Sequence, residues 1–210
     1  MSDNGGWEAV PPHSTWPGLS DPTHSVGYIN RFRDLAARGE DLWGEARLVE
    51  ALARPASRLL DAGCGPGRHG GYLAQRGHQV VGVDVDPMLI RAARADHPDV
   101  SWLVADLVTL DLAALGEPEP FDGALLAGNV MDFVTDGDRA MVLERVAAHL
   151  REDAFLVVGC RTTQAFTVED LDAALPGAGL LLEQRFSTWD LRPWRADASF
   201  CVSVARRPRA

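Results

Sequence analysis

Apolar positions along the chain form short continuous runs that alternate with longer segments of helical spacing. The continuous runs predict buried strands, and the spaced segments predict amphipathic helices. The predicted strands are residues 58–60, 79–83, 101–104, 124–127 and 155–158. Helices alternate with these strands. Two are predicted at residues 68–76 and 136–150, and two more begin at Asp86 and Thr167. This alternation predicts an α/β fold with a doubly wound, mostly parallel sheet that is covered on both faces.

The two ends of the chain depart from this alternation. Residues 25–53 have the spacing of two helices, and Pro55 ends the second. Residues 180–186 and 199–205 predict two strands with no helix between them. These two strands should pair as a terminal hairpin, so the last strand would run antiparallel to the rest of the sheet.

The same pattern predicts one domain with an N-terminal extension. Residues 1–24 are rich in Pro, Gly, Ser and Trp, which predicts a flexible arm. Residues 25–210 would form a single domain, in which residues 25–55 are a helical cap. No internal repeat or second domain boundary is visible.

Composition narrows the class of partner. The formal net charge is −10, and the 20 basic residues are all arginine. A negatively charged chain is a poor match for nucleic acid or for an anionic membrane surface. A chain without lysine forms no internal Schiff base. We therefore expect a small-molecule partner, with no nucleic acid and no membrane.

The cysteines and the N-terminus indicate a reducing compartment. Cys64, Cys160 and Cys201 are odd in number, and no Cys or His pair has the spacing of a metal site. The first residues lack the basic start and apolar core of a signal peptide, and no apolar stretch is long enough to cross a bilayer. We expect a cytoplasmic protein that binds no metal, and the sequence does not indicate its oligomeric state.

A glycine-rich loop follows the first predicted strand and precedes a helix. Residues 59–71 read LLDAGCGPGRHGG, and two cofactor motifs fit them. From Gly65 the run matches the dinucleotide fingerprint G-x-G-x-x-G, with Asp84 near the expected distance downstream. From Gly63 it reads Asp-x-Gly-x-Gly-x-Gly, which suits the nucleoside of S-adenosylmethionine.

Three features favour the register that begins at Gly63. The apolar strand ends at Leu60, whereas a dinucleotide loop would place its first glycine directly at the strand end. Acidic residues follow the second and third strands, at Asp84 and Asp106, and an acid at the latter position suits a free adenine amino group. The antiparallel closing hairpin also belongs to the methyl-donor fold.

The motifs become specific when they are taken together. Residues 59–67, 82–89, 104–107 and 121–129 resemble the successive strand-end motifs of class I S-adenosylmethionine-dependent methyltransferases, and residues 143–159 resemble the helix and strand that follow. The resemblance covers residues 58–160. It implies a Rossmann-like sheet of seven strands and S-adenosylmethionine as the cofactor. It implies almost nothing about the methyl acceptor.

The resemblance also implies a cofactor role for particular residues. The implied set is Asp61, Gly63, Cys64 and Gly65 at the methionine end, Asp84 at the ribose, Val85, Asp106 and Leu107 at the adenine, and Ala127, Gly128 and Asn129 beside the sulfonium. Absent side chains at Gly63 and Gly65 would allow close approach of the backbone. Arg68 and His69 depart from the small or hydroxyl residues often found at their positions, and either could touch the carboxylate or face solvent.

We therefore expect a methyltransferase that acts on a small-molecule acceptor by in-line transfer from S-adenosylmethionine. For such a reaction the protein contributes mainly alignment and exclusion of water. Two alternatives stay open. One is an NAD(P)-dependent oxidoreductase that uses the Gly65-Gly67-Gly70 register, and the other is a non-catalytic protein that binds S-adenosylmethionine.

Candidate acceptor residues lie outside the shared motifs. Tyr28, Trp43 and Trp194 carry aromatic rings that could stack on a planar acceptor or cover the cofactor. Asp132 and His149 are the nearest candidates for a general base, but no catalytic residue is assigned.

Overall fold

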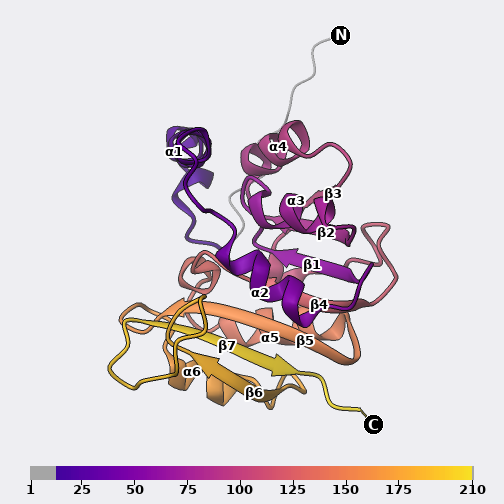
Figure 1. The fold of residues 1–210 in the computed structure, drawn as a ribbon, viewed down its shortest axis with the longest axis vertical. Helices are drawn as coiled ribbons and strands as arrows, with labels where there is room; N and C mark the ends of the chain where they lie inside the picture. Colours follow the sequence, from indigo (N-terminus) through magenta and orange to yellow (C-terminus); the bar gives the residue numbers. More distant parts are fainter. Residues whose placement is uncertain (1–12, 210) are drawn as a thin grey trace.

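The computed structural model describes residues 13–209, and a seven-stranded sheet runs through it (Figure 1). The strands are β1 Arg58–Ala62, β2 Gln79–Asp84, β3 Ser101–Val104, β4 Phe121–Leu126, β5 Leu150–Arg161, β6 Leu181–Phe186 and β7 Phe200–Arg206. Their order is β3-β2-β1-β4-β5-β7-β6. Strands β1 to β5 pair in parallel, and β7 lies antiparallel between β5 and β6. The predicted doubly wound sheet with an antiparallel C-terminal hairpin is confirmed.

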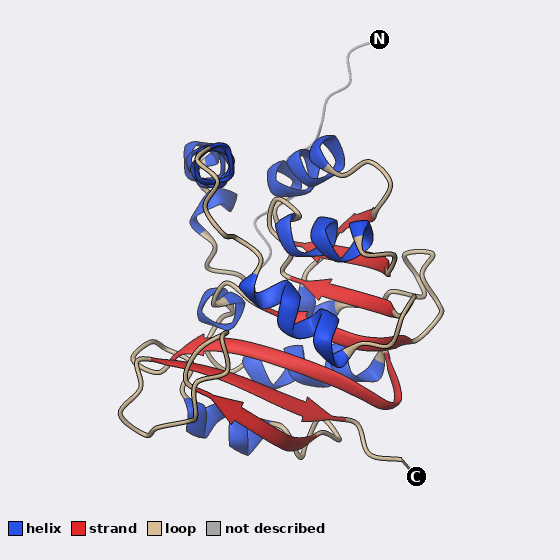
Figure 2. Cartoon of the chain, viewed as in Figure 1, coloured by secondary structure: helices blue, strands red, loops and turns tan. Residues whose placement is uncertain are grey.

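Helices cover both faces of the sheet (Figure 2). The helices are α1 Pro22–Ala37, α2 Gly44–Leu52, α3 Arg68–Gln75, α4 Pro87–Asp96, α5 Arg139–Ala148 and α6 Val168–Ala174. Helices α2 and α3 pack around Leu59 on one face, and α5 and α6 pack around Leu60 on the other. Successive strand residues point to opposite faces, so these two neighbouring leucines enter different halves of the core.

Capping residues set the helix starts. Asp86 is the N-cap of α4 and accepts a 2.7 Å hydrogen bond from the Met88 N–H, and Thr167 opens α6 with a capping box. The helix predicted from residue 136 begins instead at Arg139. Gly137 explains the delay, because its φ of 92° is incompatible with a right-handed helix.

Two strands extend beyond their apolar runs. Strand β1 continues to Ala62, because Asp61 and Ala62 pair with β2. Strand β5 begins at Leu150, and the pairing with β4 shifts register between Phe121 and Gly123. The polar residues within these extensions conceal them from the apolar pattern. One consequence is that Asp61 is a buried strand residue, 1% exposed.

The N-terminal region contains more structure than a flexible arm alone. Residues 1–12 of the predicted arm lie outside the described residues. A 3-10 turn spans Pro17–Leu19, and α1 begins at Pro22 with Asp21 as its N-cap. Helices α1 and α2 occupy most of the predicted cap. Among residues 13–209, no helix has both the length and the apolar character needed to cross a membrane.

Candidate active site

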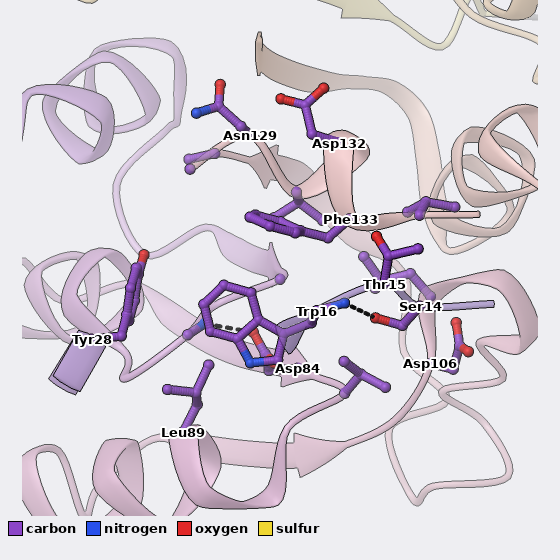
Figure 3. Close-up of a pocket in the computed structure, with 18 of the residues that line it drawn as sticks. Ser14, Thr15, Trp16, Tyr28, Asp84, Leu89, Asp106, Asn129, Asp132 and Phe133 are labelled. Atoms are coloured by element: carbon purple, nitrogen blue, oxygen red, sulfur yellow. Dashed lines mark hydrogen bonds between the residues drawn. The ribbon is translucent and has the colours of Figure 1, made fainter. Parts of the chain in front are cut away.

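The strand order reverses at β1, whose neighbours are β2 on one side and β4 on the other. In doubly wound sheets, ligands bind beyond the carboxyl ends of the strands at such a reversal. A cavity of about 790 Å³ opens at this edge, and the segments that follow β1, β2, β3, β4 and β5 contribute to its lining (Figure 3). This volume lies within the range of small-molecule sites.

The loop after β1 presents bare backbone to the cavity. Gly63 has a φ of 76°, and a side chain there would meet Val130 at 2.3 Å. Gly67 has a φ of 84° and is the N-cap of α3. Positive φ angles and close contacts require glycine at these positions. The N–H groups of Gly63 and Cys64 donate to the Val83 carbonyl and fix the loop on β2.

Asp84 ends β2 and faces the cavity. Its Oδ2 accepts a 2.8 Å hydrogen bond from the Gly65 N–H, and its Oδ1 accepts a 2.9 Å bond from the Asp86 N–H. Burial raises the pKa of this carboxyl to about 6. Each oxygen keeps further acceptor capacity, so the pair can receive two hydroxyl groups at once.

Asp106 carries an unused acceptor. Its Oδ1 accepts a 2.9 Å hydrogen bond from the Val108 N–H, but its Oδ2 is buried without a partner among the described residues. Both Asp106 and Leu107 line the cavity. A buried acceptor without a donor is costly, so this oxygen fits a ligand amino group.

Charged groups of both signs lie at the end of the cavity near α2 and α3. The Arg68 guanidinium donates to the Leu42 carbonyl at 2.8 Å and to Glu45 Oε1 at 3.1 Å, and it lies over the Phe32 ring at 4.7 Å. Arg68 and Glu45 both line the cavity. An amino acid group, with one carboxylate and one ammonium, would be complementary to this pair.

The loop after β4 forms another wall. Ala127, Gly128 and Asn129 line the cavity, and the last two have φ angles of 69° and 58°. Asn129 Oδ1 is buried without a partner among the described residues. The Tyr28 hydroxyl would lie 4.0 Å from a side chain at Gly128, so it projects from α1 toward this loop.

Residues 13–16, which we call the strap, extend along the cavity (Figure 3). The Thr15 N–H donates to the Phe133 carbonyl at 2.7 Å. The His13 Nδ1 lies 3.0 Å from Asp138 Oδ2. These contacts join the strap to the segment after β4, so it forms part of the cavity wall.

Trp16 attaches the strap to the opposite side. Its indole N–H donates to Asp86 Oδ2 at 2.8 Å, and Ser25 donates to the same oxygen. Its ring meets the rings of Tyr28 and Phe133 edge to face, with centroids 5.4 and 5.0 Å away. The aromatic wall thus joins α1, the strap and the segment after β4.

Comparison with known proteins identifies the family. A family model described as a methyltransferase domain matches residues 59–153. The crystal structure of a TehB-like S-adenosylmethionine-dependent methyltransferase from Corynebacterium glutamicum is 39% identical, with a TM-score of 0.84 over 89% of this chain and 100% of that one. The chain belongs to the S-adenosylmethionine-dependent methyltransferases. The predicted family, enzyme class and cofactor are confirmed.

Curated relatives of this methyltransferase match over shorter segments. A trans-aconitate 2-methyltransferase from Azoarcus sp. is 36% identical over 49% of this chain and 38% of its own length. A ubiquinone biosynthesis O-methyltransferase from Bradyrhizobium diazoefficiens is 37% identical over 67% of this chain and 53% of its own. The chain therefore spans about half or less of these two relatives.

Family membership favours one of the two registers of the glycine loop. S-adenosylmethionine as cofactor corresponds to the register from Gly63 and sets aside the NAD(P)-dependent oxidoreductase. The cavity of this methyltransferase brings together many of the residues predicted for the site. They are Tyr28, Gly63, Gly65, Asp84, Val85, Asp106, Leu107, Ala127, Gly128 and Asn129.

Two predicted cofactor residues lie beneath the loop, outside the cavity lining. Asp61 Oδ2 accepts a 2.9 Å hydrogen bond from the Gly70 N–H, and Oδ1 has no partner among the described residues. Burial raises the pKa of Asp61 to about 7. Cys64 packs with Trp102 in a small buried cluster. Both residues support the loop from below.

Two predicted acceptor residues are not part of the cavity wall. Trp43 is 38% exposed and stacks on Tyr72 with centroids 5.9 Å apart. Trp194 packs against the part of the core that contains Leu60, with the Arg185 guanidinium 5.7 Å from its ring. Their aromatic character is used in packing, which a sequence pattern does not distinguish from ligand stacking.

Sequence reasoning missed much of the wall. Asp132, a candidate general base, and Arg68, a possible carboxylate contact, line the cavity, and the missed lining residues are His13, Ser14, Thr15, Trp16, Arg31, Phe32, Glu45, Leu89, Val130, Phe133, Val134, Arg161 and Gln164. A tryptophan within the predicted flexible arm is the one sequence signal that could have indicated an anchored segment. The others meet only through tertiary packing.

Proposed function

We propose that this methyltransferase transfers a methyl group from S-adenosylmethionine to a small-molecule acceptor by in-line displacement. The cofactor supplies an activated methyl group on a sulfonium when bound. The residues of the chain then have three tasks: to hold the donor, to align the acceptor and to keep water away from the reacting atoms.

The residues present fit the cofactor. Asp84 would accept hydrogen bonds from both ribose hydroxyls, and the unpartnered Oδ2 of Asp106 would accept from the adenine amino group. Arg68 and Glu45 would hold the carboxylate and the ammonium of the methionine end. The backbone at Gly63 would approach this end closely, since no side chain can be placed there.

The strap is the observation that best supports a small-molecule acceptor. It joins the segment after β4 to α4, so cofactor and acceptor would share a partly covered cavity of about 790 Å³ and not a fully open groove. A polymer would need such a groove, and the net charge of −10 also disfavours a polynucleotide. Two relatives are named for trans-aconitate and for ubiquinone biosynthesis, which supports a small acceptor, whereas a third is named for 18S rRNA.

A turnover assay tests this proposal. The full chain would be incubated with S-adenosylmethionine and a panel of small hydroxyl, carboxyl, amino and thiol compounds, and S-adenosylhomocysteine formation would be measured. We expect turnover with at least one class and none with an RNA or a protein mixture. Asp84→Ala should weaken S-adenosylhomocysteine binding in isothermal titration.

Binding without turnover in every class would overturn the enzymatic proposal and favour a non-catalytic binding protein. Turnover confined to RNA or protein would overturn the small-molecule acceptor. An unchanged affinity in Asp84→Ala would remove Asp84 from the cofactor site.

A further inference from the structure

One end of the cavity carries several polar side chains, and of these only Asn129 belongs to the residues predicted to bind the cofactor. Asn129 and Asp132 lie at this end, and Asp84 and Asp106 lie toward the other (Figure 3). Arg161 and Gln164, from the end of β5 and the segment after it, also line the cavity, and the charge of Arg161 acts on Asp132. We call Asn129, Asp132, Arg161 and Gln164 the acceptor end.

Arg161 is a free cation in this lining. It is the last residue of β5 and is exposed, and its guanidinium makes no hydrogen bond or ion pair with any residue from 13 to 209. Of the other arginines in the lining, Arg68 is paired with Glu45, and Arg31 lies 5.8 Å from the centroid of the Phe32 ring. A guanidinium presents a fork of N–H donors that matches a carboxylate, so Arg161 is suited to a ligand carboxylate.

Asp132 is a carboxylate without an ion pair, and the charge of Arg161 acts on it. Its Oδ1 accepts a 3.3 Å hydrogen bond from the Phe166 N–H, and it forms no ion pair with a residue in the described part of the chain. Burial raises its pKa, while the Phe166 N–H and the charges of Arg139 and Arg161 act in the opposite direction. An aspartate in such surroundings can accept a proton from a hydroxyl group.

The two free groups are complementary to one kind of ligand. We propose that the acceptor is a small hydroxy acid, with its carboxylate on Arg161 and its hydroxyl directed at Asp132, and that the hydroxyl oxygen is methylated. This inference rests on the proposed function. An amino acid would satisfy the same two groups, but its ammonium would be repelled by the positive sulfonium of the donor.

The transfer balances without another reactant. The hydroxyl oxygen of the acceptor forms a bond to the methyl carbon as the bond from that carbon to sulfur breaks. The electron pair of the broken bond remains on sulfur, which becomes a neutral thioether. The hydroxyl proton passes to the Asp132 carboxylate, and the product is a methoxy acid.

Matched acid and amide pairs test the inference. The probes are glycolate, lactate and the three hydroxybenzoates, each with its amide. Binding to the protein saturated with S-adenosylhomocysteine would be measured by calorimetry, and turnover would be measured with S-adenosylmethionine. We expect at least one acid to bind about tenfold more tightly than its amide, which is about 1.4 kcal/mol, and to yield a methyl ether.

Variants separate the two roles. Arg161→Leu should remove the preference for the acid in both binding and KM, and Arg161→Lys should retain part of it because the charge remains. Asp132→Asn should lower kcat by about a hundredfold with little change in KM, since it removes the proton acceptor. Arg145→Leu is the matched control, because Arg145 is exposed on α5 and has no partner among residues 13–209.

Several results would overturn the inference. They are equal binding of acid and amide, an acid preference that survives Arg161→Leu, or turnover only with amines, thiols or neutral alcohols. The last result would leave methyl transfer to a small molecule intact. If no compound of any class is turned over while S-adenosylhomocysteine binds normally, the proposed function fails as well.

Discussion

The indole N–H of Trp16 donates a 2.8 Å hydrogen bond to Asp86 Oδ2, and this bond joins the strap to the N-terminus of α4. Ser25 of α1 donates to the same oxygen. Asp86 is 2% exposed, so water cannot solvate its carboxylate oxygens and these donors take the place of water. The strap, α1 and α4 thus share one buried carboxylate beside the cavity.

Trp16→Phe should loosen the strap while it preserves most of the aromatic contacts. We expect a loss of about 1.5–3 kcal/mol in the free energy of unfolding, because a hydrogen bond to a buried charged group is removed. S-adenosylhomocysteine should also bind more weakly, since the wall of the cavity opens more often. Chemical denaturation and calorimetry measure the two effects.

Trp43→Phe is the control for this change, because Trp43 is exposed and lies outside the cavity lining. It should leave the affinity for S-adenosylhomocysteine as it is. If Trp16→Phe is less stable but binds S-adenosylhomocysteine as tightly as the wild type, the Trp16 hydrogen bond contributes to folding and not to cofactor binding.

Cofactor affinity should depend on pH through Asp84. Burial raises the pKa of Asp84 to about 6, and only the ionised form accepts hydrogen bonds at both oxygens. The ionised fraction falls about tenfold between pH 7 and pH 5, so the Kd for S-adenosylhomocysteine should rise by about that factor. Calorimetry across this range measures it. Asp84→Asn should bind weakly with a flat profile, and a flat profile in the wild type would contradict the assignment.

The stability of the cofactor-free protein should respond to pH with the opposite sign. Asp61 and Asp84 have ordinary pKa values of 3.8, and burial raises their folded-state pKa values to about 7 and about 6. The folded state therefore holds these protons more tightly than the unfolded state. Their contribution to stability is complete below about pH 4 and is lost as the pH rises through about 6 to 7.

Thermal unfolding between about pH 5.5 and pH 7.5 checks this expectation. Burial lowers the pKa of His69, which contributes a rise in Tm with pH in the wild type and in the variant alike. The two aspartates should make the Tm of the free protein fall as the pH rises across this window, and Asp61→Asn should flatten this downward slope. Saturating S-adenosylhomocysteine should flatten it too, because the ligand favours the ionised form of Asp84. A Tm that rises across the window would show that other groups dominate.

The sheet, and the edge of it where the cofactor would bind, can be predicted from the sequence for a physical reason. A buried parallel strand is a continuous apolar run, as in β2, and an acid at its end must lie at the carboxyl edge of the sheet. Asp84 and Asp106 follow directly from this rule. Asp61 shows its limit, because a polar residue inside a strand ends the apolar run too early.

The residues that form the walls of the cavity are much harder to predict from the sequence. Trp16 and Asp86 are 70 residues apart in sequence, and no local pattern records their contact. Arg161 resembles any strand-end arginine until its lack of a partner is known. Trp194 shows the reverse case, since an aromatic residue between arginines suggested a ligand contact but packs on the core. Composition indicates which residues are able to bind, and tertiary structure determines which of them reach the cavity.

Close packing around the glycine loop should make Gly67 intolerant of a side chain. Gly67 and Gly77 have φ angles of 84° and 89°, so alanine would be strained by about 1–2 kcal/mol at either position. At Gly67 the added carbon would also lie 2.9 Å from Ala93 and Trp102, whereas nothing lies within 4 Å at Gly77. Gly67→Ala should therefore cost about 1–3 kcal/mol more than Gly77→Ala in urea denaturation. Only Gly67→Ala should weaken S-adenosylhomocysteine binding, and equal costs would mean that α4 and β3 yield to the loop.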